Sequence, residues 1–286
     1  MRSIALTVCF FIIAALLWVF HLPLSSRAYV RLLSDPAADH AECEDALRRA
    51  GNGAIIALRQ GLLSATGSAS AKLSCARLLA LCGEHDGDRY LLKSLRMHSR
   101  DTLGAKAEMY LISVWEQRDA PETATLARLT RLDVSPSAKS EILLSDTLLQ
   151  HPGWSHGYVW RARMNQHNSK NVDARRDALT ALLIEPDNFE AMIALSEAYV
   201  ALNSLDQAYL CLERALRINP RLRETLKKQI QDVLKALELE KTRQRRELRM
   251  ETPVTATEPR TPVSGQIAEK ARFSHLLACV ALDHHS

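Results

Sequence analysis

The sequence predicts an all-α fold built from stacked helical hairpins. Its 286 residues include only 10 glycines and 10 prolines, and 47% of them are hydrophobic. Along most of the chain, apolar residues recur at three- and four-residue steps, which is the period of an amphipathic helix. Runs that alternate apolar and polar residues, as strands do, are scarce. Pro152, Pro186 and Pro220 lie 34 residues apart, and a fixed interval of this length indicates a repeated structural unit.

The N-terminal segment, residues 1–28, is expected to be either a cleaved secretory signal or an uncleaved membrane anchor. Residues 4–20 carry no charge, and the length of this run lies between that of a signal and that of a membrane span, slightly favouring the anchor. Ser26 and Ala28 would suit a cleavage site. A buried helix of a soluble domain is disfavoured, because nothing polar interrupts the run. The chain is therefore expected at the cell envelope, membrane-anchored through one helix or exported to the periplasm.

Residues 29–119 are expected to form short helices in pairs. Asp101 suits an N-cap position, and one predicted helix carries an apolar stripe of Leu73, Ala76, Leu79 and Ala80. The segment AKLSCARLLALCGEHDGDRYLLKSL resembles a HEAT-like unit, with a helix of small residues, a turn and a leucine-rich helix. The turns are predicted at Gly51-Asn52-Gly53, Gly67-Ser68 and Gly87-Asp88.

The 34-residue register extends beyond the prolines. At two positions of the 34-residue period, each unit has a small residue, which would allow two helices to approach closely. The residue after the second of these positions is leucine in each unit. The recurring positions are Ser140, Ala174 and Ala208, then Thr147, Ala181 and Ala215, then Leu148, Leu182 and Leu216.

The last unit, residues 189–222, resembles a tetratricopeptide repeat (TPR). The two resemblances imply a right-handed solenoid of HEAT-like hairpins in residues 29–119, followed by TPR units in residues 120–222. These units are 121–154, 155–188 and 189–222. The middle unit has Arg161 and Asn165 where leucine and tyrosine are usual, although Tyr158 and Ala162 fit. The first unit is degenerate in its first helix, at Ala127, Arg128 and Arg131. The matching positions of the last unit are Leu195, Ser196, Tyr199, Ala208, Leu212, Ala215 and Pro220.

A longer stretch, HPGWSHGYVWRARM with the following RRDALTALLIEPDNFEAM, resembles a group of bacterial TPR proteins. This resemblance bears on the fold more than on an activity. The function that it implies is a non-enzymatic scaffold that binds a protein partner in a concave groove. The TPR pattern assigns that groove to His156, Val159, Arg163, Gln166, His167, Glu190, Ile193, Glu197 and Val200. A peptide or helix is the expected occupant, although the lysine and asparagine pattern of chaperone-binding clamps is missing.

The C-terminal part is predicted to be a capping and charged helix, residues 223–250, and a mostly disordered tail, residues 251–286. An apolar stripe can cover the end of the solenoid, while the Pro- and Thr-containing segment after it reads as a linker. Arg243, Arg245, Arg246 and Arg249 make an anionic lipid or a nucleic acid an alternative partner. Nucleic acid is disfavoured because no aromatic residues accompany these charges. The stripe comprises Leu222, Leu226, Ile230, Val233, Leu234 and Leu237.

Familiar catalytic motifs are absent from the sequence, so no catalytic residue, cofactor or metal is expected. One enzymatic alternative stays open, namely a site between the two helical parts that uses His151, His156 or Glu190. A metal site at His151, His156 and His167 is disfavoured because carboxylate ligands are lacking nearby. The six cysteines form no metal or disulfide pattern and are interpreted as packing residues; they are Cys9, Cys43, Cys75, Cys82, Cys211 and Cys279.

Overall fold

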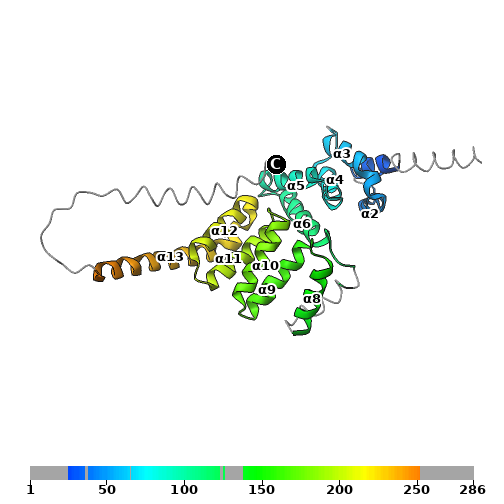
Figure 1. Cartoon of the computed structure of the whole chain (residues 1–286). Coiled ribbons are helices and arrows are strands. Elements are labelled where there is room, and N and C mark those ends of the chain that lie inside the picture. Colours follow the sequence, from blue (N-terminus) through cyan, green and yellow to red (C-terminus); the bar gives the residue numbers. More distant parts are fainter. Residues whose placement is uncertain (1–24, 36–37, 65, 123–124, 126–137, 252–286) are drawn as a thin grey trace, which may run out of the picture. The chain divides into compact units, whose positions relative to one another are not determined.

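A computed structural model describes residues 25–35, 38–64, 66–122, 125 and 138–251. This part of the chain is helical and contains no strand, as the sequence predicts (Figure 1). The described residues up to Glu240 belong to one compact unit, and those from Lys241 onward to a second. The predicted signal or anchor run and the tail beyond residue 251 lie outside the described residues. So does most of the first helix of unit 121–154.

The first half of the larger unit consists of short consecutive helices. Residues 25–32 are helical, so one helix runs through the predicted boundary at residue 28. Tyr29, Val30 and Leu33 pack into a small core with the next helices, which is built around Leu47, Leu58 and Leu79. The helices that follow are α2 His40–Ala50, the 3-10 turn η1 Gly51–Ala54, α3 Ile55–Leu63, α4 Ala69–Leu81, α5 His85–Met97 and α6 Thr102–Gln117.

The predicted turns at Gly51-Asn52-Gly53 and Gly67-Ser68 lie between helices, and the predicted N-cap at Asp101 is confirmed, but the predicted turn at Gly87-Asp88 is wrong. Ser68 caps α4 and Asp101 caps α6, each accepting a backbone N–H with its side chain. Gly87, however, lies inside α5, and the turn falls at Gly83, whose φ is +81°. A Cβ at Gly87 would lie 2.3 Å from the Ala76 carbonyl oxygen of α4. The glycine therefore serves a close approach of two helices.

The second half repeats two helical hairpins in an identical frame. Helix α9 Ser155–His167 and helix α11 Phe189–Ala201 each have 13 residues, and α10 Asn171–Ile184 and α12 Leu205–Ile218 each have 14. Both pairs begin 34 residues apart, and Figure 1 shows the four helices in succession after α8 Ala138–Gln150. The interval between the prolines is therefore the interval between hairpins.

The turns inside the two hairpins are also the same. Ser169 and Asn203 occupy the same place in their repeats and have φ values of +58° and +56°. The next residue in each repeat, Lys170 or Ser204, donates its backbone N–H to a carbonyl oxygen five residues earlier at 2.8 Å. This bond is the one that closes a helix in the Schellman motif. The two turns therefore share conformation and hydrogen bonding although their sequences differ.

The small residues that define the register are buried where the helices cross. Ala174, Ala181, Ala208 and Ala215 are fully buried, and Ser140 and Thr147 are 3% and 4% exposed. The prediction that these positions permit close approach is therefore confirmed in the hairpins α9–α10 and α11–α12. In the first unit the residues are buried, but the helix that would pair with α8 lies outside the described residues.

Replacing Ala208 by phenylalanine should overpack the last hairpin, because no space for a ring exists at a fully buried alanine. We expect a loss of about 1–3 kcal/mol in the free energy of unfolding, measured by urea denaturation. Ala201→Phe is the matched control, since Ala201 is exposed at the end of α11. An unchanged stability for Ala208→Phe would mean that the register is wrong.

The middle repeat departs from the TPR pattern through a buried polar cluster. Asp177 is 2% exposed and accepts two hydrogen bonds from Arg161, at 2.7 and 2.9 Å, and one from Asn165 at 2.9 Å. The equivalent positions of the last repeat, Leu195, Tyr199 and Cys211, share one apolar cluster. Three polar residues of the middle repeat thus take the positions that three apolar residues take in the last repeat. In both repeats the third residue, Asp177 or Cys211, comes from the second helix of the hairpin.

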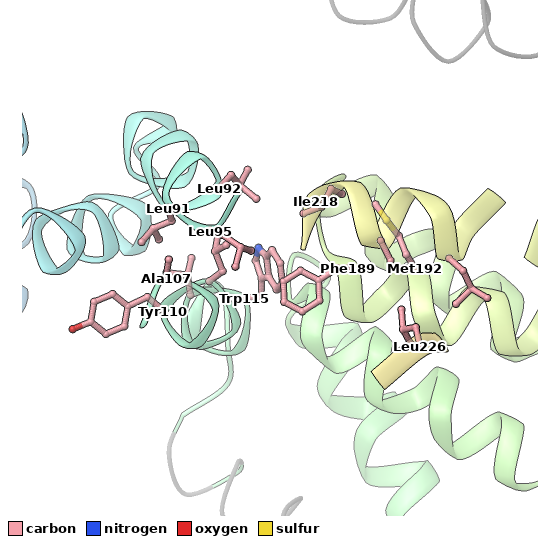
Figure 2. Close-up of a cluster of buried hydrophobic side chains, with 14 of the residues drawn as sticks. Leu91, Leu92, Leu95, Ala107, Tyr110, Trp115, Phe189, Met192, Ile218 and Leu226 are labelled. Atoms are coloured by element: carbon pink, nitrogen blue, oxygen red, sulfur yellow. The ribbon is translucent and has the colours of Figure 1, made fainter. Parts of the chain in front are cut away.

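The two halves of the larger unit share one hydrophobic core. Trp115 of α6 meets Phe189 of α11 edge to face, with ring centroids 5.0 Å apart. Figure 2 shows this pair with Leu91, Leu92 and Leu95 of α5 on one side and Met192 and Ile218 on the other. These residues form one buried cluster, to which α5, α6, α11 and α12 all contribute.

The helix after the last repeat joins the same core. Helix α13 Arg223–Glu251 follows the 3-10 turn η2 Pro220–Leu222. Leu226, Val233 and Leu237 are buried in the core shared with α12, which confirms most of the predicted stripe. Leu234 is 40% exposed, so its place in the stripe was wrong. The helix therefore covers the last hairpin, as a terminal cap should.

The described cysteines are Cys43, Cys75, Cys82 and Cys211, and all are free. Cys43 and Cys75 are buried in the first core, where burial raises the pKa of Cys75 to about 12. These thiols behave as small apolar packing residues, as predicted. Cys9 and Cys279 lie outside the described residues. Among the helices that the structure describes, none has the length and apolar character needed to cross a bilayer.

Candidate functional site

The repeated hairpins bring together residues from matching positions of the two repeats. His156 and Glu190 both follow the first residue of their helices, α9 and α11, and lie 34 residues apart in sequence. His156 Nδ1 is 3.7 Å from Glu190 Oε2. The side chain of His156 is 5% exposed and that of Glu190 is 20% exposed. Residues at matching positions of the 34-residue repeat therefore have neighbouring side chains.

Two helical turns further along α9, a basic residue lies beside the same carboxylate. Arg163 is half exposed and its Nη2 atom is 3.7 Å from Glu190 Oε1, a length that makes an ion pair but not a good hydrogen bond. Burial raises the pKa of Glu197, and the nearby charge of Arg163 opposes the rise. Arg163 thus contacts one carboxylate of the next repeat, Glu190, and influences a second, Glu197.

The other predicted groove residues lie at different depths. Val159 is fully buried with Ala181 and Ala191, so it lies beneath the surface that the TPR pattern assigns to it. Gln166 donates to the Ala194 carbonyl oxygen at 2.6 Å, and Ile193 is partly buried against the core. His167 is exposed and Val200 is 40% exposed. The first turns of the two helices are therefore buried, and their later turns reach the surface.

Sequence reasoning missed one member of the cluster. Glu116, at the end of α6, places Oε1 3.9 Å from His156 Nε2. The backbone carbonyl of Glu116 accepts a hydrogen bond from Trp154 Nε1 at 3.0 Å, which fixes α6 against the start of α9. Glu116 is 40 residues from His156, lies outside the repeat and belongs to no motif. No sequence pattern could have indicated it.

Aromatic rings surround His156. Its ring lies 5.2 Å from that of Trp160, and Trp154 and Trp160 lie 5.6 Å from each other, both pairs being roughly perpendicular. Gly157 allows this packing, since a Cβ there would lie 2.2 Å from the Trp154 ring. The histidine therefore sits in a largely apolar wall beside two carboxylates.

The electrostatics of the cluster follow from its burial. Burial, and then the positive charge of Arg163, lower the pKa of His156 to about 4. Loss of hydration thus disfavours the charged form of the ring, which is neutral at pH 7. Burial raises the pKa of Glu116, and the charge of Glu190 raises it further.

The predicted enzymatic alternative gains a convergence of titratable groups, but two cavities of the structure lie elsewhere. One cavity of about 480 Å³ lies between residues 27–34 and α3–α4, and another of about 400 Å³ is lined by Arg96, Asp187, Arg214 and Arg217. Neither includes His156 or Glu190. His151 lies in the turn before α9 rather than in the cluster. Within the described residues, no group of potential ligands forms a metal site.

The basic residues of the last helix remain a separate feature. Arg243 forms an ion pair with Glu247 at 2.8 Å, and both side chains are largely exposed. Residues 241–247 are exposed throughout. Arg249 lies within α13. The role of this segment as an alternative contact stays a prediction.

Comparisons with known proteins give a limited result. No protein-family model and no curated protein matches the sequence. Among solved structures, the complex of the TPR2AB domain of yeast Sti1 with pHSP90 aligns at 14% sequence identity, over 68% of this chain and 84% of that chain, with a TM-score of 0.35. This likeness is too distant to carry an argument about function. The case for repeats therefore rests on the chain's own two hairpins and their common 34-residue frame.

Proposed function

We propose that this chain is a TPR-like scaffold that binds a segment of a partner protein on the surface formed by the first helices of successive repeats, α9 and α11. The observation that carries the proposal is the proximity of His156 and Arg163 of one repeat to Glu190 of the next, each at 3.7 Å. Side chains of the two first helices thus lie next to one another, so a linear ligand would find a continuous row of contacts.

The rigidity of this surface supports a binding role. Both repeats share small buried residues at the helix crossings, and Asn188 joins the two hairpins by capping α11 and donating to Ser155 at 3.2 Å. A preformed surface loses little conformational entropy when a ligand binds. Helical grooves of this kind suit an extended or helical peptide.

A binding role fits the cluster better than acid–base catalysis. A histidine with a pKa of about 4 is a weak base at neutral pH, whereas a catalytic base works best with a pKa near the operating pH. We therefore assign the cluster to recognition.

The proposed setting is the bacterial cell envelope, with residues 1–28 acting as anchor or export signal. This part of the proposal rests on the apolar run of residues 4–20 and on the resemblance to bacterial TPR proteins. Mass measurement of the mature N-terminus would decide between the two forms. A protein that begins near Tyr29 would exclude the anchor.

The test of the proposed function is selection of an unbiased random-peptide library on the full-length chain. The double variant Arg163→Glu/Glu197→Arg reverses the charges of the surface. We expect the peptides enriched by the wild type to bind this variant at least about tenfold more weakly, since a like-charge contact costs more than 1.4 kcal/mol.

Glu224→Lys/Lys227→Glu is the matched control, because it reverses an exposed ion pair on α13. Enriched peptides should bind this control as they bind the wild type. Peptides that bind all three proteins equally, or a library that yields no binder, would overturn the proposal.

A further inference from the structure

We infer that the preferred ligand of this surface carries a basic side chain, an arginine or lysine, which binds between Glu116, Glu190 and His156. The inference rests on the proposed function and specifies its ligand. It does not follow from the sequence, where the groove residues are mixed in charge and Glu116 is not among them.

The first argument is the balance of charge. Glu116, Glu190 and Glu197 are three carboxylates, and Arg163 is the basic residue that the structure places beside Glu190. Since His156 is neutral at pH 7, the cluster keeps an excess of negative charge. The mutual repulsion of Glu116 and Glu190, which contributes to the raised pKa of Glu116, would be relieved by a cation placed between them.

The second argument is independent of charge. His156 Nδ1 and Glu190 Oε2 are buried, and neither has a hydrogen-bond partner among the described residues. Buried polar atoms are nearly always paired, so such a pair of atoms calls for an explanation. At 3.7 Å they are too far apart to bond to each other. A group with several N–H donors could satisfy both.

The geometry favours an organic cation over an inorganic one. A guanidinium presents five donors in a plane and an ammonium presents three, while neither accepts a hydrogen bond. Both match a site made of carboxylate oxygens and a neutral imidazole nitrogen. The aromatic rings of Trp154 and Trp160 beside His156 lower the local polarity, and a charge pair is stronger in such surroundings.

The site is also open to a ligand at its edge. The side chains of Glu116 and Arg163 are 49% and 47% exposed, whereas Glu190 is 20% and His156 is 5% exposed. The side chains are thus progressively more buried from Glu116 through Glu190 to His156. A long basic side chain can therefore enter past Glu116 while its backbone stays on the surface.

The experiment uses an oriented peptide library in which one central position is fixed as arginine, lysine, citrulline or glutamate and the flanks are degenerate. Citrulline has the shape of arginine without its charge. The full-length wild type should retain the arginine or lysine pools at least about tenfold better than the citrulline pool, and the glutamate pool least. Glu116→Gln and Glu190→Gln should each reduce the arginine preference about tenfold or more.

Glu213→Gln is the matched control, since it removes the same charge from an exposed position of α12; it should leave the preference unchanged. His156→Phe keeps an aromatic ring but removes the imidazole nitrogens. It should therefore remove the part of the arginine preference that depends on those nitrogens. Thermal unfolding checks that each variant is folded. Should Glu190→Gln unfold, the half-exposed Glu116→Gln carries the test.

The outcomes separate this inference from the proposed function. Retention that depends on Arg163 and Glu197 but does not distinguish arginine from citrulline would overturn the inference alone. If Glu213→Gln lowers the arginine preference as much as Glu116→Gln does, the preference comes from general electrostatic attraction to the protein. This result would also overturn the inference. Absence of any retention that depends on the surface would overturn both.

Discussion

Asp177→Ala is expected to lower the free energy of unfolding by about 3–5 kcal/mol, the usual cost of removing one partner of a buried ion pair. Asp177 is 2% exposed and accepts hydrogen bonds from Arg161 and Asn165. Without it, a guanidinium that is 22% exposed would keep only a weak hydrogen bond to the Ser145 hydroxyl at 3.5 Å, and the buried Asn165 amide would lose its acceptor. Urea denaturation of the full-length chain measures the difference.

A triple replacement tests the physical reason. Arg161→Leu/Asn165→Tyr/Asp177→Cys installs the residues that the last repeat has at the same positions, Leu195, Tyr199 and Cys211. An apolar set of suitable shape should replace a buried charge cluster without loss, or with a gain of about 1–4 kcal/mol. A triple variant as unstable as Asp177→Ala would show that the two triads are not equivalent and that the repeat frame fails in the middle unit.

Arg118→Met should be the second large change, with a cost of about 3–5 kcal/mol at pH 7. Arg118 follows α6 and binds Asp88 of α5 at 2.9 and 3.0 Å and the Ala80 carbonyl oxygen of α4 at 2.7 Å. It also forms an ion pair with Glu185, the residue after α10. Its loss would leave two buried carboxylates without their cation at the junction of the two halves.

The cost of Arg118→Met should depend on pH. Burial raises the pKa values of Asp88 and Glu185 although Arg118 opposes the rise. A group whose pKa is raised by folding contributes stability that is present below its unfolded pKa and is lost as pH rises through its folded pKa. In the variant the folded pKa values lie higher still, so the loss is greatest near neutral pH and shrinks as pH falls toward 4.

Arg176→Met is the control for both statements. Arg176 is 70% exposed and its partner Asp173 is on the same helix, so its loss should cost less than about 1 kcal/mol at any pH. Thermal or urea unfolding at pH 7 and near pH 4.5 compares the two variants. A cost for Arg118→Met that is equal at both values would contradict the argument from the buried carboxylates.

The regular part of the fold could be predicted because it depends on local periodicity. The equal spacing of Pro152, Pro186 and Pro220 and the small residues between them fix the helix lengths and crossings, and the structure has hairpins in that frame. Side chains that need only their own repeat, such as Ala208, were placed correctly.

Features that depend on neighbours distant in sequence could not be predicted. Gly87 resembles a turn residue, yet it lies in a helix because the backbone of α4 passes close to it. Arg161 and Asn165 depart from the repeat pattern in the sequence, and only the structure shows that both donate hydrogen bonds to Asp177. Glu116 joins the candidate site because Trp115 and Trp154 fix α6 against the repeats. These relations need a packed structure.

The most direct test of the central claim, that the ligand binds on α9 and α11, is photo-crosslinking of a library-selected peptide. Benzoylphenylalanine replaces Val200 in one protein and Leu183 in another; they are 40% and 83% exposed, and Leu183 is on α10. The account predicts that the peptide crosslinks from position 200 and not from position 183. Equal or stronger crosslinking from position 183 would contradict it.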